Sequence, residues 1–167
     1  PSVLQRRMIQ GTCETLERYT GLPVRSWRNH AYKHNKQTPY LLYEAGVVTW
    51  SDWVSYREYR PCHHPSGVTV LPINTLPDHE NLRHGARQPS LVAKEGSGSA
   101  YPPDRWCEMV CTQVEIITDN GGIATILAHP ICMHIVDDFA TFEKMCRFLS
   151  RYTSLSAGEV PKCIHSS

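Results

Sequence analysis

The chain has 167 residues, of which 41% are hydrophobic and 20% are charged, as in an ordinary globular domain. The formal net charge is +1, and the sequence has neither a basic run nor a polyanionic tail, so composition gives no support to a nucleic-acid or membrane partner. No apolar stretch approaches the length that a bilayer-spanning helix needs.

The cysteines indicate a reduced protein. There are seven, an odd number, and none are spaced as Cys-x-x-Cys, which argues against both a disulfide framework and a zinc ribbon. We therefore predict free thiols, with Cys107 and Cys111 buried on one helical face. The unpaired thiols and the absence of a recognisable secretory leader favour the cytoplasm.

The first third of the chain alternates between helical and extended patterns. Apolar spacing and the positions of glycine and proline predict two helices and two strands. The helices are expected over residues 3–19 and 40–45, with Thr38-Pro39 opening the second, and the strands over residues 24–27 and 47–49.

The rest of the chain is less regular. Residues 51–103 are rich in Pro, Gly, His and Ser, with one predicted strand at 68–73 and a long loop at 81–99. Helices are predicted over residues 104–117 and from Asp137-Asp138 to residue 151, followed by a weakly ordered tail.

Residues 121–130 form the most informative segment. Two glycines lead into a continuous apolar run that ends on His129 and Pro130. Such a run predicts a strand buried on both faces, and proline ends its pairing because it cannot donate to the ladder. His129 is thereby predicted at the carboxyl end of a buried strand, where α/β barrels carry their chemistry.

Together these elements predict an α/β fold, specifically a partial or distorted (β/α) barrel with parallel strands. Residues 1–152 would form the barrel portion and residues 153–167 the tail. Because about four strands leave open sheet edges, we expect either a missing N-terminal part of the protein or a second copy of the chain to close the sheet.

Charged and aromatic side chains follow several predicted strands. Arg28 could bind a carboxylate or substrate oxygen, or pair with a loop acid at the surface. Asp52 beside Trp53 suits a sugar site, in which an aromatic face stacks on a pyranose ring, or else a capped turn. His129 is the strongest candidate for general acid–base work.

Two histidine-containing clusters are weaker candidates. Asp78, His79 and Glu80 are neighbours in a tight turn, and neighbours rarely point at one ion, so we expect no metal site from these three alone. His63-His64 is predicted to be a solvated loop, because adjacent side chains on a strand point to opposite faces.

In chain order, these segments resemble the polysaccharide deacetylase family of NodB-like carbohydrate esterases. Residues 21–28 are similar to the family segment that ends in its active-site arginine, with His30 where the family has proline. Leu71-Pro72, leading to Asp78, is similar to the "E-L-P…D-D" strand. Residues 121–130 resemble the "L-x-x-H-P" motif, with one residue rather than two between Leu127 and His129.

The resemblance implies a role for each matching residue. His129 would be the general acid, and Arg28 would orient the catalytic carboxylate. Leu127 would shape the acyl pocket, and the remaining substrate contacts would come from His30, Asp52, Trp53 and Asp78.

The resemblance also implies an Asp-His-His-bound divalent ion, zinc or similar, and an aspartate base. These groups come from two motifs near the family's N-terminus, whereas residues 1–22 contain no histidine and no aspartate. We therefore expect the metal only in the complete protein, with no metal ligand in this chain.

The activity that the resemblance implies is metal-dependent hydrolysis of an N-acyl, non-peptide C–N bond, with a carbohydrate or small N-acyl compound as substrate. Two alternatives remain at this point. One is a catalytically inactive carbohydrate-binding or interaction module that lost the metal site. The other is a hydrolase of a small cyclic amide or imide.

Overall fold

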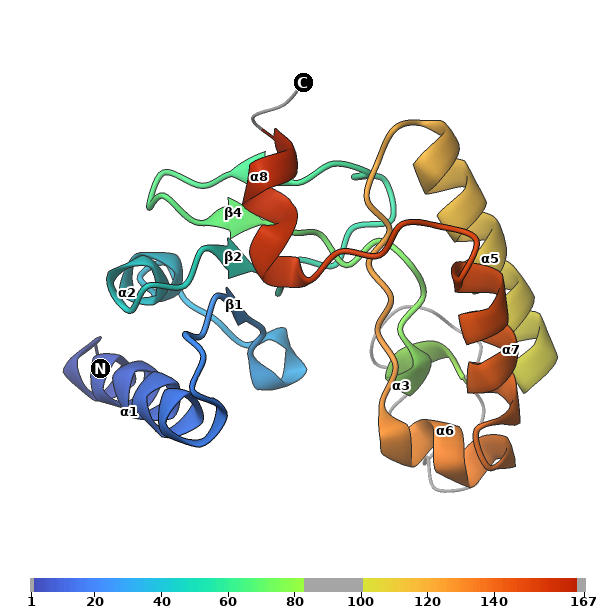
Figure 1. Cartoon of the computed structure of the whole chain (residues 1–167), viewed down its shortest axis with the longest axis horizontal. Helices are drawn as coiled ribbons and strands as arrows, with labels where there is room; N and C mark the ends of the chain where they lie inside the picture. The colour runs from blue at the N-terminus through green and yellow to red at the C-terminus, as the bar shows by residue number, and fades with distance from the viewer. Residues whose placement is uncertain (1, 83–100, 165–167) are drawn as a thin grey trace. The chain divides into compact units, whose positions relative to one another are not determined.

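The computed structural model describes residues 2–82 and 101–164, and the chain divides into two compact units (Figure 1). The first unit comprises Pro1–Val54, Arg60–Pro72 and Leu155–Ser167, and the second comprises Ser55–Tyr59 and Ile73–Ser154. The single barrel portion predicted over residues 1–152 stays a prediction. Most of the predicted loop at 81–99 lies outside the described residues.

The first unit is built on a four-stranded sheet. Its elements are α1 (Ser2–Thr20), β1 (Ser26–Trp27), η1 (His30–Tyr32), α2 (Thr38–Glu44), β2 (Thr49–Trp50), β3 (Cys62–His63), β4 (Thr69–Val70), η3 (Ala157–Glu159) and α8 (Val160–Ile164). The strand order is β1-β2-β4-β3, with β1, β2 and β4 parallel and β3 antiparallel to β4. The fold is therefore α/β with a mostly parallel sheet, as predicted, and it is consistent with a partial barrel.

One core holds this unit together. α1 and α2 lie side by side (Figure 1). Apolar side chains from both helices and from the strands bury one another: Ile9, Cys13, Leu41, Leu42, Val47, Trp50, Val68 and Val70. The helical spacing in residues 3–19 correctly predicted α1, because only one stripe of that helix faces this core.

The sequence-based predictions for two segments of this unit were wrong. Of the predicted His63-His64 loop, His63 lies in β3, where it pairs with Thr69, although its side chain stays exposed. The tail is not weakly ordered over 157–164, because the Ser156 and Glu159 side chains form a reciprocal capping box and Val160 is buried.

The second unit consists of helices and extended segments. Its helices are α3 (Asp78–Asn81), α5 (Pro103–Asp119), α6 (Pro130–Asp137) and α7 (Ala140–Leu149). α5 and α7 pack side by side (Figure 1), and fully buried Trp106, Cys107, Val110, Met133 and Met145 form much of their shared core. Among the described residues, no helix combines the length and hydrophobicity that crossing a membrane requires.

The predicted strand at residues 121–130 is absent. The segment runs without a strand ladder, and side chains from residues 74–78 satisfy its backbone instead. The Asn74 amide donates to the Ile123 carbonyl at 3.0 Å, and its oxygen accepts from the Thr125 N–H at 2.9 Å. The Thr75 hydroxyl donates to the Thr125 carbonyl at 2.7 Å. The apolar run does not show that its backbone will pair with the side chains of Asn74 and Thr75. A strand was therefore predicted wrongly from the length of the run.

Candidate functional site

The residues predicted to form the site fall into two groups, one in each unit. Arg28, His30, Asp52 and Trp53 belong to the first unit. Asp78, Leu127 and His129 belong to the second.

In the first unit, Asp52 is a buried hydrogen-bond acceptor. Its carboxylate is 0% exposed and accepts from the Asn29 N–H at 2.7 Å, the Asn29 amide and the Trp50 indole. His34 Nδ1 lies 3.8 Å away. The oxygens of Asp52 therefore serve the turns that follow β1 and β2, and its predicted place in a substrate groove stays a prediction.

Arg28 follows β1 and is held against the end of β2. Its Nε donates to the Ser51 carbonyl at 2.9 Å, and its Nη2 donates to the Ser51 hydroxyl at 2.7 Å. Burial lowers the pKa of the guanidinium, while the charges of Tyr32 and Asp52 act in the opposite direction. Arginine nevertheless remains cationic at physiological pH, so the group is a fixed positive charge.

The other two predicted residues of this unit are accessible. Trp53 is 41% exposed, and His30 is exposed at the start of η1, where the backbone turns through left-handed Ala31 and Tyr32. Their predicted contacts with substrate stay predictions.

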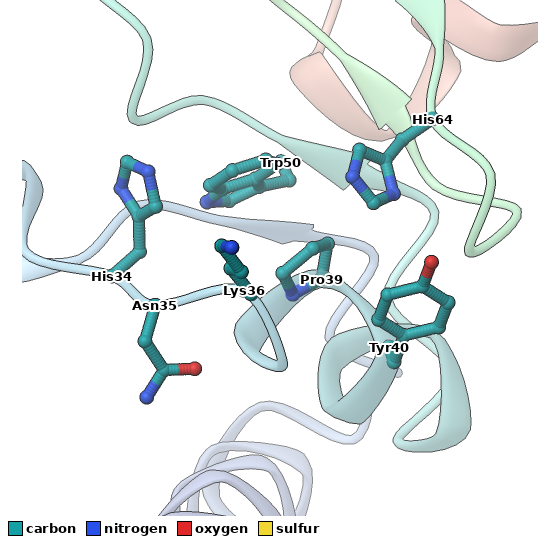
Figure 2. Close-up of a pocket in the computed structure, with 7 residues that line it drawn as sticks. All are labelled: His34, Asn35, Lys36, Pro39, Tyr40, Trp50 and His64. Carbon is teal, nitrogen blue, oxygen red and sulfur yellow. The ribbon is translucent and has the colours of Figure 1, made fainter.

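Sequence reasoning missed an open pocket in the first unit, of about 550 Å³ (Figure 2). It is lined by His34, Asn35, Lys36, Pro39, Tyr40, Trp50 and His64. Trp50 lies between the imidazoles of His34 and His64, at ring-centroid distances of 4.8 Å and 6.0 Å, and Tyr40 lies 5.6 Å from His64 (Figure 2). The lining therefore combines aromatic faces with hydrogen-bonding groups and one lysine.

In the second unit, Asp78 and His129 form a hydrogen-bonded pair. His129 Nδ1 lies 2.7 Å from Asp78 Oδ1, and the His129 backbone N–H donates to Oδ2 at 2.6 Å. The carboxylate is 0% exposed, whereas the imidazole side chain is 45% exposed. Both oxygens of the buried Asp78 carboxylate are thus engaged by His129, and the predicted contact of Asp78 with substrate stays a prediction.

The chain around this pair is fixed from several directions. The Asp78 N–H donates to the Leu127 carbonyl at 3.4 Å, and Leu127 itself is half-buried. The Trp106 indole of α5 donates to the Leu76 carbonyl at 3.1 Å. His129 is the N-cap residue of α6, a helix whose first turn contains Pro130.

Two further side chains stand beside His129. The exposed His79 ring has its centroid 5.4 Å from that of His129, and its Nδ1 lies 3.9 Å from the sulfur of buried Cys132. The sequence analysis did not connect Cys132 with His79, because these two residues and His129 come together only when α6 begins at His129-Pro130. A proline directly after a polar residue was the available signal for that helix start.

No protein-family model and no curated protein sequence matches the chain. A search of solved structures matches the crystal structure of a "putative polysaccharide deacetylase" from Mycobacterium smegmatis, with a TM-score of 0.69 and 22% identity over 88% of this chain. This chain has a deacetylase-like fold. It covers 50% of the matched chain, and at this identity the likeness shows the fold alone.

The resemblance implies an Asp-His-His donor set for a divalent ion. In the part that the structure describes, no aspartate and pair of histidines are close enough to share an ion; the group that is close enough consists of His79, His129 and Cys132. The described residues therefore do not fit an Asp-His-His centre.

Proposed function

We propose that this chain carries the general-acid part of a polysaccharide deacetylase-like hydrolase that cleaves an N-acyl C–N bond of a carbohydrate. The Asp78–His129 pair is the observation that supports this proposal. A buried carboxylate fixes one nitrogen of an imidazole whose side chain is 45% exposed. That arrangement is how a histidine is oriented for proton transfer.

The pair assigns each nitrogen of His129 a task. Because Asp78 accepts only from a protonated Nδ1, Nε2 is the nitrogen that exchanges a proton with substrate. Water adds to the acyl carbon, the C–N bond breaks, and the Nε2 proton passes to the departing amine nitrogen. The Asp78 carboxylate keeps the ring oriented during the transfer. The base that activates the water, and any metal, would come from outside the residues described.

The test is acyl release from N-acetylated sugar oligomers by the complete polypeptide that contains these residues. His129→Ala should lower turnover about 10²–10⁴-fold and leave the near-ultraviolet circular dichroism unchanged, because the ring is half-exposed. His134→Ala is the matched control, since His134 also lies on α6 and its side chain is 62% exposed. Unchanged turnover in His129→Ala would exclude the acid role. If the protein hydrolyses cyclic imides rather than N-acetylated sugars, the acid role of His129 stands and only the proposed substrate class changes.

The pocket of the first unit supports a second candidate, a carbohydrate-binding module without catalysis. Tyr40 is 47% exposed and can stack on a sugar ring, while His34, Asn35 and His64 offer hydrogen bonds to hydroxyl groups. Calorimetry with N-acetylglucosamine oligomers should then show binding that Tyr40→Ala weakens and Tyr19→Ala, at a 79%-exposed site on α1, leaves unchanged. Equal binding by both variants would exclude this pocket.

A further inference from the structure

Three side chains of the second unit that ligate soft divalent metals meet at the start of α6. They are His79 from α3, His129 at the N-cap of α6, and Cys132 one turn into that helix. One ligand atom from each lies within 4.8 Å of the other two. Cys132 is buried and closes the group on the protein side, whereas His79 is exposed and His129 half-exposed on the solvent side.

Asp78 organises both histidines from behind. It binds Nδ1 of His129 at 2.7 Å, which leaves Nε2 as the ligand atom of that ring, and it accepts from the His79 backbone N–H at 2.7 Å. A metal-binding histidine commonly donates its other N–H to a carboxylate, which fixes the tautomer and makes the ring a better ligand. The carboxylate is 0% exposed, so this support is held in place.

A tetrahedral ion would draw the three ligand atoms closer together than they lie here. Zn–S bonds of about 2.3 Å and Zn–N bonds of about 2.0–2.1 Å place neighbouring ligand atoms about 3.3–3.6 Å apart. The Cys132 sulfur and His79 Nδ1 are already 3.9 Å apart, and the exposed His79 ring can rotate without disturbing the core. Three protein ligands leave a fourth position for water.

We propose that His79, His129 and Cys132 bind one zinc-class divalent ion, with Asp78 supporting His129 as a hydrogen-bond partner. One thiolate and two imidazoles select zinc or cobalt over magnesium or calcium, which prefer oxygen ligands. On binding, the Cys132 thiol gives its proton to solvent as the metal–sulfur bond forms, and the imidazoles bind in their neutral form.

A metal ion bound to Nε2 of His129 prevents that nitrogen from transferring a proton to the substrate. The ion is therefore an inhibitor of the hydrolysis proposed above, and this consequence alone rests on that proposed function. Metal binding itself does not, because it can be measured without substrate.

Cobalt(II) is the probe, because its bond to a thiolate gives a charge-transfer absorption band. Titration of the chain carrying Cys62→Ser, Cys146→Ser and Cys163→Ser, which removes the three exposed thiols, should show one equivalent bound with such a band. Cys132→Ser should abolish the band, and His79→Ala should weaken binding at least about tenfold. Asp78→Asn should weaken binding about 10–100-fold. His134→Ala should leave it unchanged. A missing band in the starting protein, or a band that persists in Cys132→Ser, would overturn the proposal.

Two measurements keep the tests separate. X-ray absorption spectroscopy of the zinc-loaded starting protein needs no variant at the site. The spectrum should show one sulfur and several nitrogen or oxygen atoms bound to zinc. Zinc bound without sulfur would contradict the proposed site. If Cys132-dependent cobalt binding is found but His129→Ala keeps full turnover, the metal site stands and the proposed hydrolysis fails. If His129→Ala abolishes turnover but no ion binds through Cys132, the reverse holds.

Discussion

At the scale of single residues, buried carboxylates organise both units. The side chains of Asp52 and Asp78 are each 0% exposed, and each accepts hydrogen bonds from the turns around it. A buried charge is tolerated only with such partners. The two aspartates therefore shape the turns around them, and the accessible groups beside them, His34 and His129, are the ones that can meet a ligand.

Asp52→Asn should destabilise the first unit. The amide keeps the shape but places an NH₂ group where one oxygen accepts from the Asn29 amide and the Trp50 indole. We expect the free energy of unfolding to fall by about 2–4 kcal/mol. Urea denaturation followed by tryptophan fluorescence measures this loss. Asp138→Asn, at an 84%-exposed side chain, is the control; equal losses in both variants would contradict the account.

Cys111 should resist alkylation. Burial, and then the neighbouring Cys107, raise the pKa of its thiol to about 12. Iodoacetamide reacts with thiolates, so at pH 8.5 the exposed Cys62, Cys146 and Cys163 should label first. In urea, all seven cysteines should label alike. Because the folded-state pKa is raised, the stability that this thiol contributes is present at neutral pH and is lost as the pH rises from the unfolded value toward 12. Early labelling of Cys111, read by mass spectrometry, would contradict this environment.

At the scale of elements, the long regular segments were predictable and the short ones were not. α1 and α5 show clear helical periodicity, so their existence followed from apolar spacing. α6 was missed because its residues continue an apolar run that reads equally well as a strand. α8 was missed although Ser156 and Glu159 have capping-box spacing, since a five-residue helix has too few positions to show a period.

The candidate site was predictable only in part. His129 was chosen because it was predicted at the end of a buried strand, but no strand precedes it, and its acid role stays a prediction. Asp78 was taken as a substrate contact, since sequence cannot tell a buried carboxylate from an exposed one. Cys132 drew no attention, because its closeness to His79 depends on folding across more than fifty residues of chain.

Gly122 should be irreplaceable in the turn after α5. A Cβ atom there would lie 2.5 Å from the Tyr59 carbonyl oxygen and 2.9 Å from Ile117 Cγ2. Gly122→Ala should therefore lower the free energy of unfolding by about 1–3 kcal/mol. Gly11→Ala in α1 meets nothing within 4 Å and should stabilise that helix by about 0.5–1 kcal/mol. Chemical denaturation of the two variants should show opposite signs; a loss in both would contradict the close approach at Gly122.

At the scale of the whole molecule, the described residues form two hydrophobic cores, one in each unit. Regions with their own cores commonly open as separate cooperative units. We therefore expect Gly122→Ala to reduce amide protection across α5 and α7 while α1 and α2 keep theirs. Hydrogen–deuterium exchange with mass spectrometry measures both at once. An equal loss of protection in all four helices would show a single cooperative unit.

Asp78 and His129 are proposed to act as one general acid, on a chain that covers 50% of a polysaccharide deacetylase-like structure. The most direct measurement is a double-mutant cycle, with Asp78→Asn, His129→Gln and the combination, on acyl release by the complete polypeptide. If the two residues act together, the double variant should be no slower than His129→Gln, since Asp78 works only through the imidazole. Independent, additive losses, or full turnover in His129→Gln, would contradict the account.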